Sequence, residues 1–148
     1  MCKVTPEILF ITVTGLPPKM MVDELNTRLA DAGIDTPERI AAFLAIAAFR
    51  SEDFKNLDGG LMALSPANRE AFATDTDTSV AYVSTLSGSV ESAIWYWTKN
   101  KLNELADIRD YRALGVAVNG VKSHFPHWDI EALGKLIETT IRLTKSPI

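Results

Sequence analysis

The sequence predicts an all-α domain, and three stretches in which apolar residues recur at helical spacing carry that prediction. They are 36–54 (TPERIAAFLAIAAFRSEDF), a stretch that begins at Ser89, and one that runs from about 128 to 144. At 148 residues, the chain is short enough for one domain and long enough to bury a core. We therefore expect a single domain over 1–148.

The stretch 36–54 has the features of a central buried helix. Thr36 is a favourable N-cap residue, and Pro37 is a favourable first helical residue. Larger apolar side chains repeat at helical spacing, and alanines fill most of the other positions. Because small side chains let neighbours approach from several sides, we expect this helix to anchor the core.

Three further helices are expected in the first half of the chain, at about 6–13, 18–32 and 66–74. Gly33 is a typical C-terminal stop for the second, and Ser65 is a typical N-cap for the third. The inner face of the second helix is predicted to consist of Met21, Leu25, Leu29 and Ala32.

The second half is predicted to contain a loop, a short turn and three helices. Residues 75–89 are polar and rich in turn formers, so we expect a loop with room for one helical turn, and Ser89 as the N-cap of the helix that follows. A short turn is expected at 102–106, and Asp110 should cap a helix over 111–118. The last helix, 128–144, should turn inward the side chains of Ile130, Leu133, Leu136, Ile137 and Ile141.

Composition excludes several classes of function. The net charge is −4 and the basic residues are scattered, which argues against a nucleic-acid-binding protein. The apolar stretches are too short to span a membrane, and the N-terminus lacks signal-peptide features, so a cytoplasmic location is expected. Cys2 is the single cysteine, and His124 and His127 flank a proline, so we expect no metal or cofactor.

Two stretches resemble the family 19 glycoside hydrolases, the chitinases and phage endolysins with a lysozyme-like α-helical fold. The stretch 34–54, IDTPERIAAFLAIAAFRSEDF, is similar to the family's central helix, IxTPxRIAAFLAQIAHESGGF. From Ser89, SVESAIWYWTKNKLNELADIRDYRALGVAVNG is similar to the family's AAWFWxSRGLNxLADxGDFxAITxxING. The resemblance implies a single lysozyme-like, chitinase-like domain.

The resemblance also implies that the catalytic half of the motif is lost. The Glu of the family's central helix is the general acid, and in an ungapped alignment it falls on Arg50, which cannot deliver a proton at neutral pH. The family's long loop with the second carboxylate should lie between Phe54 and Leu57, where almost nothing remains. Inverting glycosidases need both carboxyl groups, so glycosidase activity is not expected.

Six residues are candidates for a residual cleft or binding site: Arg50, Ser51, Glu52, Ser65, Trp95 and Asn119. Arg50 either forms a local ion pair or fills the former cleft and binds a carboxylate or a partner. Ser65 and Asn119 match family residues that position water and contact sugar, or they serve only as a helix cap and a helix stop. Trp95, or its neighbour Tyr96, either stacks on a sugar or belongs to the core.

These features leave three hypotheses for function. The first, which we favour, is a catalytically inactive pseudoenzyme that binds another protein, as a phage- or prophage-type regulator, an inhibitor or an immunity-like partner. The second is a pseudoenzyme that binds peptidoglycan or chitin, and the third is a divergent active hydrolase. The first is favoured because loss of the loop leaves little concave surface for a sugar chain.

Overall fold

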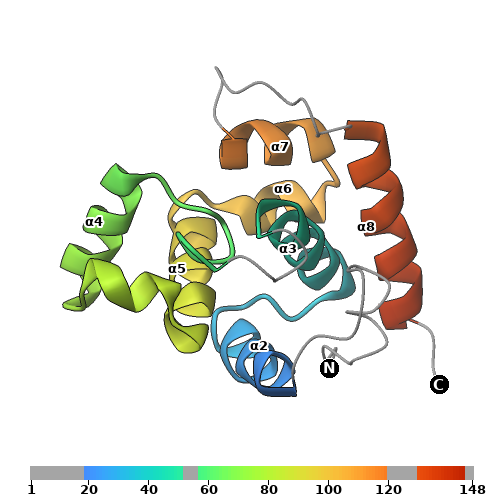
Figure 1. Cartoon of the computed structure of the whole chain (residues 1–148). Coiled ribbons are helices and arrows are strands. Elements are labelled where there is room, and N and C mark those ends of the chain that lie inside the picture. Colours follow the sequence, from blue (N-terminus) through green and yellow to red (C-terminus); the bar gives the residue numbers. More distant parts are fainter. Residues whose placement is uncertain (1–18, 52–56, 120–129, 146–148) are drawn as a thin grey trace.

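The computed structural model describes residues 19–51, 57–119 and 130–145, and within these ranges it contains helices and no strand (Figure 1). This confirms the predicted all-α class. The helix expected at 6–13 lies outside the described residues. The elements are α2 (Lys19–Asp31), α3 (Pro37–Arg50), α4 (Pro66–Thr76), the 3-10 helix η1 (Val80–Ser84), α5 (Leu86–Lys99), α6 (Leu102–Asp107), α7 (Tyr111–Asn119) and α8 (Ile130–Lys145).

Helix α3 is buried at the centre of the described structure, as its alanine-rich sequence predicted. It lies between α5 and α8 in Figure 1, and every residue from Ile40 to Ala48 is at most 3% exposed. The side chain of Thr36 accepts a hydrogen bond from the backbone N–H of Arg39 at 3.2 Å, which is the predicted cap. The ring of Phe43, on α3, meets the ring of Trp97, on α5, edge to face with centroids 5.3 Å apart.

Helix α3 ends at Arg50, earlier than the stretch to Phe54 that the sequence suggested. Ser51 leaves the helical conformation, with φ −108° and ψ 15°, while its backbone N–H still donates to the carbonyl of Ala47. Residues 52–56 lie outside the described residues. In the sequence, the apolar periodicity stops at this point, and Arg50 is followed by the polar run Ser51, Glu52 and Asp53.

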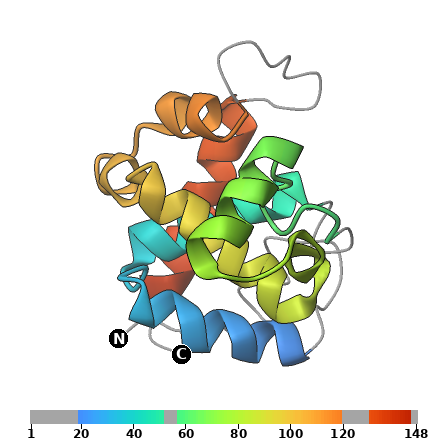
Figure 2. The same cartoon turned by 90° about the vertical axis from the view of Figure 1, so that its left-hand side faces the viewer.

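Helices α2 and α5 pack side by side and run in the same direction (Figure 2). Two polar contacts fix this register: Ser87 Oγ donates to Glu24 Oε1 at 3.1 Å, and Arg28 Nη1 lies 3.1 Å from Glu91 Oε1. The predicted inner face of α2 is confirmed at Met21, Leu25 and Leu29, which are at most 2% exposed. Ala32 is partly buried beyond the end of the helix.

The beginning of α5 differs from the prediction. Ser89 was expected as the N-cap, but Thr85 holds that position, and its hydroxyl accepts a hydrogen bond from the N–H of Gly88 at 3.0 Å. Ser89 is fully buried one turn into the helix, where its hydroxyl donates to the carbonyl of Leu86. The region 75–89 was expected as a loop with room for one helical turn. It contains the end of α4, the turn of 3-10 helix η1 and the beginning of α5.

Helices α6 and α7 lie between α5 and α8 in the chain, and α5 and α8 flank α3 (Figure 1). The predicted short turn at 102–106 is the six-residue helix α6. Asp110 caps α7 as predicted, because its Oδ1 accepts from the N–H of Ala113 at 3.0 Å. Arg39 on α3 donates to both carboxylate oxygens of Asp107 on α6, at 2.9 and 2.8 Å.

Helix α8 covers α3 along much of its length (Figure 1). Its predicted inner face is confirmed at Ile137 and Ile141, which are buried, and at Leu136, which is partly buried against the core. The predicted start at Trp128 and the side chains of Ile130 and Leu133 lie outside the described residues.

Candidate functional site

The first candidate region is the carboxyl end of α3, where Arg50 stands. Its Nε donates to the carbonyl of Met62 at 3.1 Å, and its Nη2 donates to the carbonyl of Ala63 at 3.2 Å. The next carbonyl, that of Leu64, accepts from Arg69 Nε at 2.9 Å. Two guanidinium groups therefore hold three consecutive backbone carbonyls of the segment between α3 and α4.

This segment, 57–64, needs external hydrogen bonds because it is buried without regular secondary structure. Leu61, Met62 and Leu64 are at most 3% exposed. Gly59, Gly60 and Ala63 have positive φ angles of 83°, 80° and 49°. Buried carbonyl groups without partners are costly, so the two arginines stabilise this conformation.

Arg50 is half-buried beside Tyr96. Burial lowers the pKa of the Arg50 guanidinium from its ordinary value, and the nearby Tyr96 partly offsets that effect. Because an arginine begins so far above neutral pH, it stays charged. Burial raises the pKa of Tyr96, whose hydroxyl donates to the carbonyl of Ala117 on α7 at 2.5 Å. The ends of α3 and α7 thus meet at α5.

The other residues that the sequence singled out near Arg50 have separate surroundings. Ser51 is fully buried, and its hydroxyl donates to the carbonyl of Ala47 at 2.6 Å. Ser65 is exposed and caps α4, where its hydroxyl accepts from the N–H of Asn68 at 3.3 Å. Asn119 is the last residue of α7; its side chain, like the whole of Glu52, lies outside the described residues.

Trp95 belongs to a different region, between α5 and α4, where it packs against the edge of the core. Its indole is partly buried, and its Nε1 donates to Asp75 Oδ2 at 3.0 Å. The ring meets the edge of Phe72 with centroids 5.7 Å apart, and the ammonium of Lys99 lies 4.8 Å from the centroid of the ring. Neighbouring Trp97 is fully buried, so the two tryptophans have separate roles.

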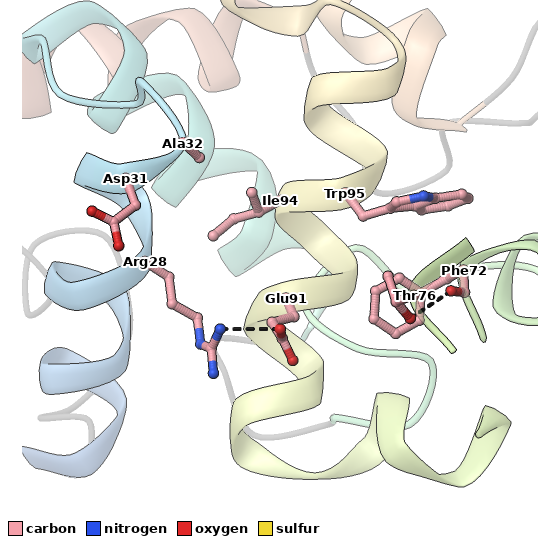
Figure 3. A pocket seen from close by; sticks show the side chains of 8 residues that line it. All are labelled: Arg28, Asp31, Ala32, Phe72, Thr76, Glu91, Ile94 and Trp95. Carbon is pink, nitrogen blue, oxygen red and sulfur yellow. Dashed lines mark hydrogen bonds and ion pairs between the residues drawn. The ribbon is translucent and has the colours of Figure 1, made fainter. Parts of the chain in front are cut away.

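Trp95 lines a groove that α2, α4 and α5 form together, with a cavity volume of about 300 Å³. We call it the Trp95 groove, and Figure 3 shows its lining, in which the indole reaches from α5 toward α4. The lining consists of Arg28, Asp31, Ala32, Phe72, Thr76, Glu91, Ile94 and Trp95. Its surface combines an apolar floor with charged rims, which is the usual composition of a binding site.

A network of hydrogen bonds and ion pairs closes one end of the Trp95 groove. Arg28 Nε donates to Glu24 Oε2 at 2.7 Å, and its Nη1 pairs with Glu91 at 3.1 Å. The second oxygen of Glu91 accepts from the hydroxyl of Tyr82. The bond from Arg28 to Glu24 raises the pKa of the guanidinium, and the bond to Glu91 raises the pKa of Tyr82.

A second groove continues on the far side of this network, along the first half of α2. Its cavity volume is about 560 Å³, and it is lined by Met20, Asp23, Glu24, Thr27, Tyr82, Thr85, Leu86 and Ser87. Met20 is 67% exposed, which is high for a large apolar side chain. The two grooves together follow the seam between α2 and α5.

No metal centre is found in the part of the chain that the structure describes, since no three His, Cys, Asp or Glu side chains there could hold an ion. Cys2, His124 and His127 lie outside it. Among the described helices, none is both long and apolar enough to cross a membrane.

Sequence reasoning identified Trp95 but missed the residues that form a groove around it. Arg28 and Glu91 are 63 positions apart, and nothing in the local pattern signals their contact. The sequence does place Glu24 four residues before Arg28, but such pairs are common on exposed helix faces and do not indicate a groove. No protein-family model matches the sequence, and a search of curated proteins finds no match to it.

Proposed function

We propose that this chain is a lysozyme-like protein without glycosidase activity that acts by binding another protein. The observation that supports this most is the use of Arg50. At the position that matches the family's general acid, its guanidinium holds the carbonyls of Met62 and Ala63. A permanently charged group that ties backbone segments together cannot serve as a proton donor.

Loss of activity is tested with the purified protein on peptidoglycan and on colloidal chitin. We expect no fall in turbidity for the wild type. We also expect none for Arg50→Glu, because inverting hydrolysis needs a second carboxylate as well as the acid. A family 19 hydrolase run in parallel shows that the substrates are competent. Clearing of either substrate by the wild type would contradict the proposal.

Protein binding is tested by in-cell crosslinking in the native host, followed by reconstitution. The expected result is one partner that, once purified, binds the purified chain with a fixed stoichiometry in sedimentation experiments. Reconstitution is essential because crosslinking alone also captures chance neighbours. If no captured protein re-forms a complex when pure, the proposal of a protein partner fails.

A second candidate function is glycan binding, and one observation favours it. Trp95 is partly exposed along a groove, and aromatic rings in grooves can stack on sugars. In NMR titrations with chitotriose or a soluble muropeptide, this function requires saturable shifts at Trp95, or near Ser65 and Asn119. Shifts at these residues without any protein partner would place this candidate first.

A further inference from the structure

We propose that the Trp95 groove receives a lysine or arginine side chain from the partner protein. This inference rests on the proposed function, because it names the surface and the chemistry with which the chain would bind that partner. The hydrogen bonding, the charge and the shape of the groove support it.

Among the polar side chains that line the Trp95 groove, Asp31 alone makes no hydrogen bond or ion pair with another described residue. Both carboxylate oxygens of Glu91 have partners, the hydroxyl of Thr76 donates to the carbonyl of Phe72 at 2.7 Å, and the indole N–H of Trp95 is bound to Asp75. The lining side chain without a partner among the described residues is thus an anion, exposed on the α2 rim (Figure 3). Its natural complement is a cation.

The charge around the groove also favours a cation. Around the groove, the four carboxylates of Glu24, Asp31, Asp75 and Glu91 outnumber the two cations, Arg28 and Lys99. Arg28 already lies between two of these carboxylates, so its own charge is balanced. Complementary charge of this kind increases the rate and the specificity of association between proteins.

The floor of the groove suits the aliphatic part of a basic side chain. Ala32, Ile94 and the rings of Phe72 and Trp95 supply apolar surface beside the charged rim. Lysine and arginine place methylene groups on such a surface while the charged end reaches a carboxylate. The position of Lys99, 4.8 Å from the centroid of the Trp95 ring, shows that this indole already accommodates a cation.

A neutral sugar complements the lining of the Trp95 groove less well than a basic side chain does. Sugar hydroxyls need several donors and acceptors, yet the groove offers one carboxylate without a partner. The cavity of about 300 Å³ is at the small end of ligand pockets, which matches one long side chain better than a chain of sugar rings. Beyond the Arg28 network, the second groove and Met20 extend the surface for the rest of the partner segment.

The test is an NMR titration of the isotope-labelled full chain with three defined probes. These are blocked arginine (N-acetyl-arginine methylamide), blocked citrulline, which has the same shape without the charge, and chitotriose. We expect saturable shifts of the Trp95 indole N–H and the Ile94 methyl groups with blocked arginine. Citrulline should bind about two- to fivefold more weakly, since an exposed charge pair contributes that much.

Asp31→Asn should weaken binding of blocked arginine by a similar factor of about two to five. The matched control is Glu70→Gln, which removes an exposed carboxylate of α4 that lies outside the groove lining and has no partner among the described residues. It should leave the affinity unchanged. Both substitutions are on the surface, so the variants should fold.

Three outcomes would overturn the inference: no shifts in the groove with blocked arginine, equal effects of Asp31→Asn and Glu70→Gln, or saturable groove shifts with chitotriose alone. The last outcome would assign the groove to glycans. Failure here is separable from failure of the proposed function. If a reconstituted partner binds wild type and Asp31→Asn equally well, the protein-binding function stands and the groove is not its docking site.

Discussion

At the scale of single residues, Arg50 has a structural role at the end of α3. In the proposed resemblance to family 19 hydrolases, this position would match the general acid, a role that the charge of arginine excludes. The structure adds that the side chain bridges α3 and the segment 57–64 through two backbone carbonyls. The residue therefore contributes to the stability of a buried segment that has no regular secondary structure.

Replacement of this guanidinium should lower the free energy of unfolding. In Arg50→Met, the carbonyls of Met62 and Ala63 lose these donors, and we expect a loss of about 1–3 kcal/mol in urea unfolding. Arg112→Met is the matched control, because Arg112 is exposed on α7 and should change stability by less than about 0.5 kcal/mol. Equal stability of the two variants would mean that Arg50 does not hold the segment.

At the scale of elements, the beginning of α5 depends on a contact with η1. The N–H of Gly88 is capped by Thr85, and a Cβ atom built on Gly88 would lie 1.8 Å from the carbonyl oxygen of Tyr82. The two backbones approach so closely that only glycine fits. This approach explains why α5 begins at Leu86 and accommodates a glycine in its first turn.

Gly88→Ala should therefore destabilise the protein although alanine is the better helix former. Helix propensity alone would favour alanine by about 1 kcal/mol, whereas displacement of the η1 backbone should cost about 3 kcal/mol or more. Gly134→Ala should cost less, since the added atom meets only the ring of Tyr111, at 2.9 Å. Thermal unfolding of both variants measures the difference; a stabilised Gly88→Ala would show that the close approach does not exist.

At the scale of the whole molecule, α3 is enclosed by its neighbours. Its alanines from Ala41 to Ala48 are at most 3% exposed, so other helices approach its backbone on several sides. A helix enclosed in this way has no face on which a larger side chain could be accommodated without displacing a neighbour.

Ala45→Leu tests this enclosure. The added atoms have no space, and we expect a loss of about 1–3 kcal/mol in the free energy of unfolding. Ala30→Leu makes the same chemical change on the exposed side of α2, and it should alter stability by less than about 0.5 kcal/mol. If the two variants are equally stable, the packing around α3 is looser than described.

The three tyrosines predict how stability depends on alkaline pH. The bond to Glu91 raises the pKa of Tyr82, and burial raises the pKa of Tyr96 and of Tyr111. In the unfolded chain, tyrosines ionise near about pH 10, whereas in the native protein they stay protonated to higher pH. This contribution is fully present below about pH 10 and is lost as the pH rises further.

We therefore expect the free energy of unfolding to fall as the pH rises above about 10, and less steeply in Tyr111→Phe. Tyrosinate absorbance should show that the tyrosines of the native protein titrate at a higher pH than those of the chain unfolded in urea. If the native tyrosines titrate at the same pH as those of the urea-unfolded chain, their pKa values are not raised in the native protein.

Much of the fold could be predicted from the sequence because its signals are local. Thr36 and Asp110 cap helices that the residues next to them define, and Ile137 and Ile141 lie on the inner face that their spacing predicted. Ser89 was mistaken for the cap of α5, because the choice between Ser89 and Thr85 depends on the approach of η1. Of the candidate site, the sequence indicated Trp95 and missed Asp31 and Arg28.

By itself, the sequence determined the all-α class, the central position of α3 and the absence of a glutamate at position 50. These follow from residue identity and from periodicity within one helix. Only the tertiary structure decided what Arg50 contacts, where α5 begins and that Trp95 shares a groove with Asp31. Those features depend on residues far apart in the chain, and their contacts are set by how whole helices pack.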